Sequence, residues 1–105
     1  LGHRYRARLY NSLLEKDKQV YVFGAGINGI YAAKELQGHG VCVLAFCDNN
    51  PELWGTAIME GIKCIDFRCA DITVPFVVAV KETSVAEISK QIEIGGGKVL
   101  GCINT

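Results

Sequence analysis

Apolar residues in this chain come in short uninterrupted runs, and glycines or polar segments separate the runs. Residues 20–23 and 41–47 consist entirely of apolar side chains, so neither alternating face of either run is polar. That pattern is typical of strands inside a parallel sheet that is covered on both faces. Between them, residues 30–36 combine small residues with strong helix formers, and a glycine cluster follows. The pattern therefore predicts a strand, a helix and a second strand.

Three further strands and one further helix are predicted downstream. The strands are expected at residues 62–65, 75–80 and 98–103. Ser84 and Glu87 have the spacing of a capping box, so the helix is expected to begin at Ser84 and to end at the glycines 95–97. The fold class expected is α/β, a small doubly wound domain with a five-stranded parallel sheet of strand order 3-2-1-4-5. The third strand is expected at an edge.

The first 18 residues are interpreted as a separate amphipathic segment. Large apolar residues recur at helical spacing over residues 4–16, while the charged residues fall largely elsewhere. Residues 19–105 then form the domain itself. Because the chain begins at Leu1 without a methionine and stops close behind an expected strand, we expect a piece of a longer protein.

Composition limits what such a chain can do. A length of 105 residues with 50% hydrophobic residues suits one domain with one core, which excludes a complete two-domain dehydrogenase or transferase. The 11 Lys and Arg residues balance the 11 Asp and Glu residues, so we expect no nucleic-acid partner. The longest apolar runs fall far short of the roughly 20 residues of a membrane span, so we expect no membrane insertion. The cysteines lack the pattern of a disulfide framework, which fits a reducing compartment, so we expect a place in the cytoplasm.

The five cysteines are interpreted as buried thiols rather than as a redox or metal site. Their number is odd and they are scattered among apolar residues, which is not the pattern of a disulfide framework. The chain has no C-x-x-C pair and only two histidines, so no zinc site is expected. The cysteines are Cys42, Cys47, Cys64, Cys69 and Cys102.

The first predicted strand runs directly into a glycine-rich turn of the pattern G-x-G-x-x-G, which opens the predicted helix. Its members are Gly24, Ala25, Gly26, Ile27, Asn28 and Gly29. In such turns the first glycine permits a tight turn, the second lets a pyrophosphate approach the backbone, and the third lets the helix pack closely on the strands. The helix N-terminus supplies N–H groups and positive potential. The turn therefore predicts a nucleotide-binding site.

An acidic residue follows at the distance that a dinucleotide site requires. Asp48 comes 19 residues after Gly29, at the carboxyl end of the second predicted strand, where a carboxylate can accept hydrogen bonds from ribose hydroxyls. Its neighbour Asn49 is included among the expected cofactor-binding residues. The carboxylate would repel a 2′-phosphate and no arginine adjoins it, so NAD is expected rather than NADP. The alternative is a tight turn without ligand, in which Asp48 only starts an Asx turn.

Two residues outside these motifs have an open assignment. Lys81 follows the fourth predicted strand at the edge where ligands of such sheets bind, and it either contacts the cofactor or belongs to a polar loop. Trp54 either stacks on a base or closes the core below a turn. The chain has no nucleophile elbow, no P-loop and no credible acid–base pair, so we expect no catalysis by this chain alone.

Three stretches of the chain resemble a known kind of domain. VYVFGAGINGIYAAKEL, VLAFCDNNPELWG and GIKCI are similar to Rossmann-like CoA-binding and NAD-binding modules, over about residues 19–104. Such modules occur in polysaccharide-biosynthesis proteins, in front of sugar acyltransferases and FkbM-like methyltransferases, and in Rex-type redox repressors. The resemblance implies a Rossmann-like fold in which the three glycines hold phosphates and Asp48 accepts the ribose or base. Asn28 departs from the acyltransferase modules, which usually have histidine there.

Two functions of different kinds remain open. One is a module that binds NAD, or alternatively a nucleotide-sugar such as a UDP-sugar, for a fused catalytic domain or within a homo-oligomer of a sugar-modifying or polysaccharide-biosynthesis protein. The other is a structural or oligomerisation domain that keeps the scaffold but has lost its ligand. Ligand-induced shifts in thermal unfolding separate the two.

Overall fold

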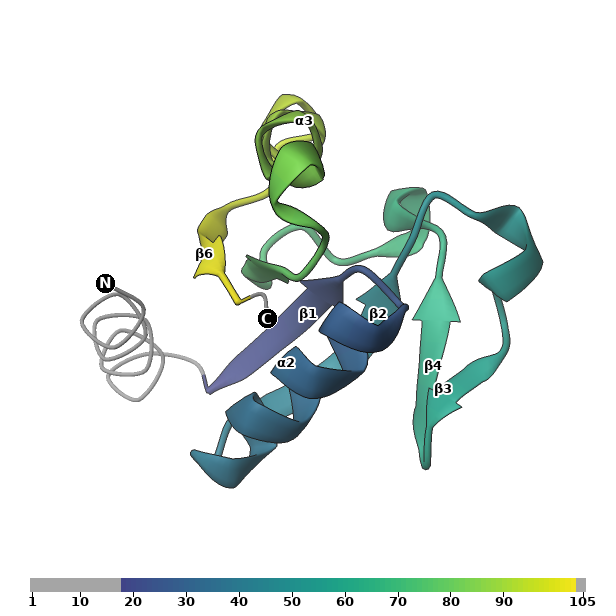
Figure 1. The fold of residues 1–105 in the computed structure, drawn as a ribbon. Coiled ribbons are helices and arrows are strands. Elements are labelled where there is room, and N and C mark those ends of the chain that lie inside the picture. The colour runs from purple at the N-terminus through teal and green to yellow at the C-terminus, as the bar shows by residue number, and fades with distance from the viewer. Residues whose placement is uncertain (1–17, 104–105) are drawn as a thin grey trace.

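A single sheet forms the centre of the structure (Figure 1). The computed structural model describes residues 18–103, and the helix predicted over residues 4–16 lies outside this range. Within the described residues, five strands are parallel, and the sixth, β3, runs antiparallel to β4 at the edge of the order β3-β4-β2-β1-β5-β6. The strands are β1 (Gln19–Phe23), β2 (Cys42–Cys47), β3 (Ala57–Met59), β4 (Ile62–Ile65), β5 (Phe76–Val78) and β6 (Val99–Cys102).

The prediction of five strands that are all parallel is wrong in strand number and in the full strand order. All five predicted strands are present and lie beside the neighbours expected for them, but β3 adds a sixth strand next to β4. Residues 62–65 are therefore not at an edge. Gly61, at a φ of +77°, lets the chain turn back between β3 and β4. β3 has only three residues, none of them fully buried, so its hydrophobic pattern is too short to predict a strand.

One described helix lies on each face of the sheet. α2 (Ile27–Gly38) buries Ala32, Ala33 and Leu36 in one apolar cluster, and α3 (Glu82–Ile94) buries Ile92 in the other. In Figure 1, α2 runs beside β1 and in front of β2, and α3 lies on the other side of β1, where it contacts β5 and β6. The doubly buried strands predicted from the apolar runs are a consequence of these two layers.

Side chains of β1 alternate between the two layers. Val20 and Val22 pack in the cluster with α2, whereas Tyr21 and Phe23 pack in the cluster with α3. β2 contains one residue more than β1 over the paired stretch, which produces a β-bulge at Leu44. Leu44 is consequently 40% exposed although it lies inside an apolar run.

α3 begins earlier than the capping-box pattern predicts. Its first residue is Glu82, and its N-cap is Lys81, which forms no side-chain cap hydrogen bond. The backbone N–H of Ser84 donates to the carbonyl oxygen of Lys81 at 2.9 Å, so Ser84 already lies within the first turn. The acidic Glu82 interacts favourably with the positive end of the helix there. The predicted end is confirmed, because α3 stops before Gly95.

The chain crosses from β4 to β5 through a short 3₁₀ helix, η2 (Phe67–Cys69). The ring of Phe67 lies 5.4 Å from that of Phe76 and 6.0 Å from that of Phe23, so η2 covers the sheet on the α3 side. Since β1, β2, β4 and β5 are parallel, their carboxyl ends meet at one edge of the sheet. α2 follows β1 and α3 follows β5 at that edge, which is the place to look for a site.

Candidate functional site

Two glycines of the turn are required by the close approach of backbone segments. Gly24 has a φ of +121°, and a Cβ atom there would overlap the carbonyl oxygen of Ala79, just beyond β5. A Cβ atom on Gly29 would overlap the carbonyl oxygen of Gly24. The N–H of Gly24 donates to the carbonyl of Cys47 at 2.8 Å, so the turn is joined to the end of β2. These are the steric roles expected for the first and third glycines of the pattern.

Gly26 has a different environment, because a Cβ atom there would meet nothing within 4 Å. It is exposed, and it is the N-cap of α2, whose first ladder bond runs from the N–H of Ile30 to the Gly26 carbonyl at 3.0 Å. The N–H groups of the first helical turn have no acceptor within a helix, and they carry its positive end. Ile27, the first residue of α2, is 83% exposed. The turn therefore presents open space at a helix N-terminus, which suits an anion.

Asp48 lies directly beside this turn. Its Oδ2 accepts the N–H of Ala25 at 3.0 Å, and its Oδ1 accepts the N–H of Asn50 at 2.9 Å. The first bond supports the glycine turn, and the second is the Asx turn that was the structural alternative. Each carboxylate oxygen accepts one of these bonds and has a second lone pair. Asp48 is half-buried, so its carboxylate supports the turn and still has a surface that a ligand can reach.

Trp54 helps to hold the backbone at Asp48. It follows the 3₁₀ helix η1 (Pro51–Leu53), and its indole Nε1–H donates to the carbonyl oxygen of Asp48 at 2.7 Å. Its half-buried ring packs against the α2-side cluster. The structure thus favours the core-closing interpretation of Trp54 over stacking on a base.

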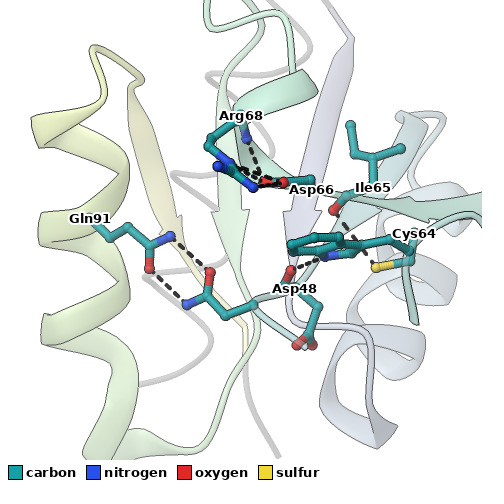
Figure 2. Close-up of polar contacts among 8 residues, drawn as sticks. Asp48, Cys64, Ile65, Asp66, Arg68 and Gln91 are labelled. Carbon is teal, nitrogen blue, oxygen red and sulfur yellow. Dashed lines mark hydrogen bonds and ion pairs between the residues drawn. The ribbon is translucent and has the colours of Figure 1, made fainter. Parts of the chain in front are cut away.

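The other two predicted residues lie at different places on this edge. The amide of Asn49 forms a reciprocal pair of hydrogen bonds with Gln91 of α3, at 2.8 and 2.9 Å (Figure 2). Lys81 is exposed at the start of α3, two residues after the Ala79 carbonyl against which Gly24 packs. The glycine turn and Asp48 are therefore joined by a hydrogen bond, and Lys81 follows β5 at the same edge of the sheet. The Asn49 side chain is engaged by α3.

Sequence reasoning missed three residues near the site. Gln91 carries no signal in the sequence, because nothing distinguishes it from any other polar residue of a helix. Asp66 directly follows β4, as Asp48 follows β2, and this repetition could have been noticed. Arg68 donates to Asp66, with a shortest distance of 2.6 Å between Nη2 and Oδ2 (Figure 2). These hydrogen bonds hold the pKa of the Asp66 carboxyl below its usual value.

The cysteines differ in burial, which the sequence did not predict. Cys47 and Cys64 are buried as expected, but Cys42 and Cys69 are exposed and Cys102 is half-buried, and all are free thiols. Burial raises the pKa of the Cys47 thiol to about 12 and that of Cys64 to about 11, with Asp48 contributing to both. At neutral pH these two thiols therefore keep their protons and are poor nucleophiles. Among residues 18–103, no cluster of three or more His, Cys, Asp or Glu could hold a metal ion.

Comparisons with known proteins identify the fold but no family. No family model matches the chain. A 54-residue stretch is 46% identical to the UDP-N-acetylmuramoylalanine--D-glutamate ligase of Chelativorans sp. (strain BNC1), covering 51% of this chain and 11% of the ligase. RSP, a Rex-family repressor, superposes with a TM-score of 0.60 at 18% identity, over 94% of this chain and 60% of that chain. RSP in complex with β-NADH gives a TM-score of 0.58 at 17% identity, over 98% and 52%. The chain thus has a Rossmann-like fold and spans only part of each protein it resembles.

One sequence-based expectation is overturned by these comparisons. RSP in complex with β-NAD⁺ and operator DNA shares the fold, with a TM-score of 0.60 at 18% identity over 92% of this chain and 48% of that chain. A domain of this kind therefore occurs in a protein that binds DNA, and the exclusion of a nucleic-acid partner was wrong. The balanced charge of one domain does not decide the partners of a longer protein, because nucleic-acid binding depends on where charges cluster. Within residues 18–103, no helix is long and apolar enough to cross a membrane.

Proposed function

We propose that this domain binds a dinucleotide, NAD(H), at the edge formed by the glycine turn, Asp48 and Lys81. The observation that carries the proposal is the open space above Gly26, at the N-terminus of α2 and beside a fixed carboxylate. The flanking glycines, Gly24 and Gly29, leave no such space, so the turn is built tightly except where a phosphate needs to approach. The similarity to repressor structures that contain β-NAD⁺ and β-NADH supports the choice of ligand.

Each part of the edge then has a role. The pyrophosphate lies against the backbone of residues 25–28, where the helix dipole attracts its charge. Asp48 accepts ribose hydroxyls through the lone pairs that Ala25 and Asn50 leave unused. Lys81, at the N-cap of α3 just beyond β5, places a positive charge where the second half of the ligand binds. Arg68 does not offer a ready site for a 2′-phosphate, since its guanidinium is paired with Asp66, and NAD(H) is therefore preferred to NADP(H).

The wider role that we propose is a ligand-binding module of a larger protein, fused to a catalytic domain or assembled as a homo-oligomer. A nucleotide-sugar is the second candidate ligand, within a sugar-modifying or polysaccharide-biosynthesis protein. The observation that favours it is the 46% identity over 54 residues to a ligase whose name specifies a UDP-linked substrate. Both candidates place a diphosphate at the α2 N-terminus, so the nucleoside and its ribose distinguish them.

Calorimetric titration of the chain with NADH, NAD⁺, NADPH, UDP and UDP-N-acetylglucosamine tests the proposal. We expect saturable binding of NADH and NAD⁺, weaker binding of NADPH, and no heat from the two uridine ligands. Tighter binding of UDP-N-acetylglucosamine than of NADH would replace the first candidate by the second. Absence of binding by all five ligands would leave a scaffold without a ligand and overturn the proposal.

A further inference from the structure

Two amides join the loop after β2 to α3. The Nδ2 of Asn49 donates to the Oε1 of Gln91 at 2.8 Å, and the Nε2 of Gln91 donates back to the Oδ1 of Asn49 at 2.9 Å. The two residues are 42 positions apart in the sequence. Each amide thus uses one donor and one acceptor on the same partner, which fixes the rotamers of both side chains. We call this pair of residues, Asn49 and Gln91, the amide latch.

The two ends of the amide latch differ in how firmly they are held. Gln91 precedes Ile92, which is fully buried in the α3-side cluster, so its helix is fixed to the sheet. Asn49 and the following Asn50 and Pro51 are exposed. A segment with little buried surface opens more easily than a packed helix. The helix is therefore the anchor, and the loop after β2 is the part that is held (Figure 2).

The residue that the held loop carries is Asp48. Its carboxylate reaches the glycine turn through the N–H of Ala25 at 3.0 Å and the next loop residue through the N–H of Asn50 at 2.9 Å. If the loop moves away from the glycine turn, the hydrogen bond from Ala25 lengthens, because Ala25 lies outside the loop, and the lone pairs that face the ligand turn away. The bond from Asn50 lies inside the loop and moves with it. The Asn49 amide is itself committed to Gln91, so we do not expect Asn49 to contact the ligand directly.

We propose that Gln91 is a positioning residue, which acts through Asn49 to hold the Asp48 carboxylate where it accepts a ribose hydroxyl. This inference rests on the proposed function for its ligand, but the positioning itself is a property of the free protein. An exposed amide pair competes with water and adds little to folding stability. Removal of the amide latch should therefore change the position of the Asp48 carboxylate and the affinity for the ligand more than it changes the free energy of unfolding.

The first test needs no ligand. Amide hydrogen exchange measured by NMR at Ala25 and Asn50, the two donors to Asp48, reports directly on its position. We expect about three- to tenfold faster exchange at the Ala25 amide in Gln91→Ala, equivalent to a hydrogen bond of ordinary net strength, and a smaller change at Asn50, whose bond lies inside the loop. The control is Gln37→Ala, which removes an exposed glutamine from the other helix, α2. Unchanged exchange in Gln91→Ala overturns the inference, whether or not the protein binds NADH.

The second test is a double-mutant cycle on ligand affinity. Asn49→Ala and Gln91→Ala should each weaken NADH binding about three- to tenfold, and the double variant should lose no more than either single variant. The preference for NADH over NADPH should become smaller in all three variants, because a displaced Asp48 no longer repels the 2′-phosphate of NADPH. The exchanged pair, Asn49→Gln with Gln91→Asn, should restore both quantities.

Three other results would contradict the inference or the proposed function. Losses that add in the double variant, or a loss in Asn49→Ala without one in Gln91→Ala, would show that Asn49 contacts the ligand itself and overturn the inference. A lower midpoint of thermal unfolding with an unchanged ratio of NADH to NADPH affinity would show that the amide latch only stabilises the fold, and this result would also overturn the inference. If the wild type binds neither dinucleotide, the proposed function fails and the ligand part of the inference fails with it, while the exchange measurement still decides the positioning.

Discussion

The three glycines of the turn share one residue type but have three different surroundings. Gly24 and Gly29 would each place a Cβ atom on a backbone carbonyl, whereas Gly26 faces open space. A sequence pattern cannot show this difference, because it records only that a side chain is missing. The structure assigns two of the glycines to folding and leaves the third for a ligand.

Gly26→Val should therefore abolish or weaken NADH binding by at least about tenfold while the protein still folds, since the added side chain fills only the space that a phosphate needs. Calorimetry measures the affinity, and circular dichroism checks the fold. Gly38→Val is the matched control, because Gly38 ends the same helix and also has nothing within 4 Å of a Cβ atom. Equal affinity in the wild type and in Gly26→Val would remove the phosphate site from the proposal.

Asp48→Ala should weaken NADH binding by about 1 to 3 kcal/mol, the range for loss of one side of a charged hydrogen bond, and should narrow the preference over NADPH. It should also destabilise the fold, because the N–H groups of Ala25 and Asn50 lose their acceptor. Asp48→Asn keeps one acceptor oxygen but sets its NH2 group against the other backbone N–H, so it should lower the stability of the fold as well as the affinity for NADH. A destabilised Asp48→Ala variant with full NADH affinity would return Asp48 to a purely structural role.

The buried thiol of Cys47 should make the free energy of unfolding fall as the pH rises in the alkaline range. Burial raises the pKa of its thiol from 9.0 to about 12, so the folded state keeps the proton in a range where the unfolded state loses it. Unfolding then releases a proton, and the free energy of unfolding falls as pH rises above 9, by up to about 1.4 kcal/mol per pH unit from this group. Urea unfolding between pH 8 and 10.5 should show a shallower decline in Cys47→Ala than in the wild type. Cys42→Ala, which removes an exposed thiol, is the matched control.

Among the elements, the strands whose residues are apolar on both faces were predicted best. The residues of β1 after Gln19, the last three residues of β2 and all of β5 are buried, which requires apolar side chains on both faces of the sheet. β3 could not be predicted in this way, since its three residues are half-buried or exposed and its pairing depends on the conformation of Gly61. The start of α3 was misplaced because the capping box at Ser84 is a local signal, whereas the helix already begins at Glu82, with Lys81 as its N-cap.

Gly61→Ala should destabilise the fold by about 1 kcal/mol, because an alanine at a φ of +77° is strained even though its Cβ atom would meet nothing within 4 Å. Gly38→Ala is the comparison, since Gly38 is helical and should gain stability or stay neutral. Chemical denaturation of both variants measures the difference. Equal effects of the two substitutions would contradict the dependence of the β3–β4 turn on a left-handed glycine.

At the scale of the whole molecule, parallel strands bring the candidate site together from segments far apart in the sequence. The glycine motif and Asp48 could be found in the sequence, because the motif directly follows one strand and the 19 residues from Gly29 to Asp48 contain one helix and a second strand. Gln91 and Arg68 could not, because their places depend on how α3 and η2 pack across the sheet. What sequence reasoning recovers is thus the part of the site within one β-α-β unit.

The hydrogen bond from Trp54 to the carbonyl of Asp48 has an optical consequence. Trp54 is the only tryptophan of the chain, so all indole emission originates at the residue that adjoins the proposed ribose contact. Reduced nicotinamide absorbs in the band where indole emits, which makes NADH an energy acceptor for this donor, whereas NAD⁺ is not one. The unlabelled protein would therefore report the oxidation state of its own ligand as a change in fluorescence.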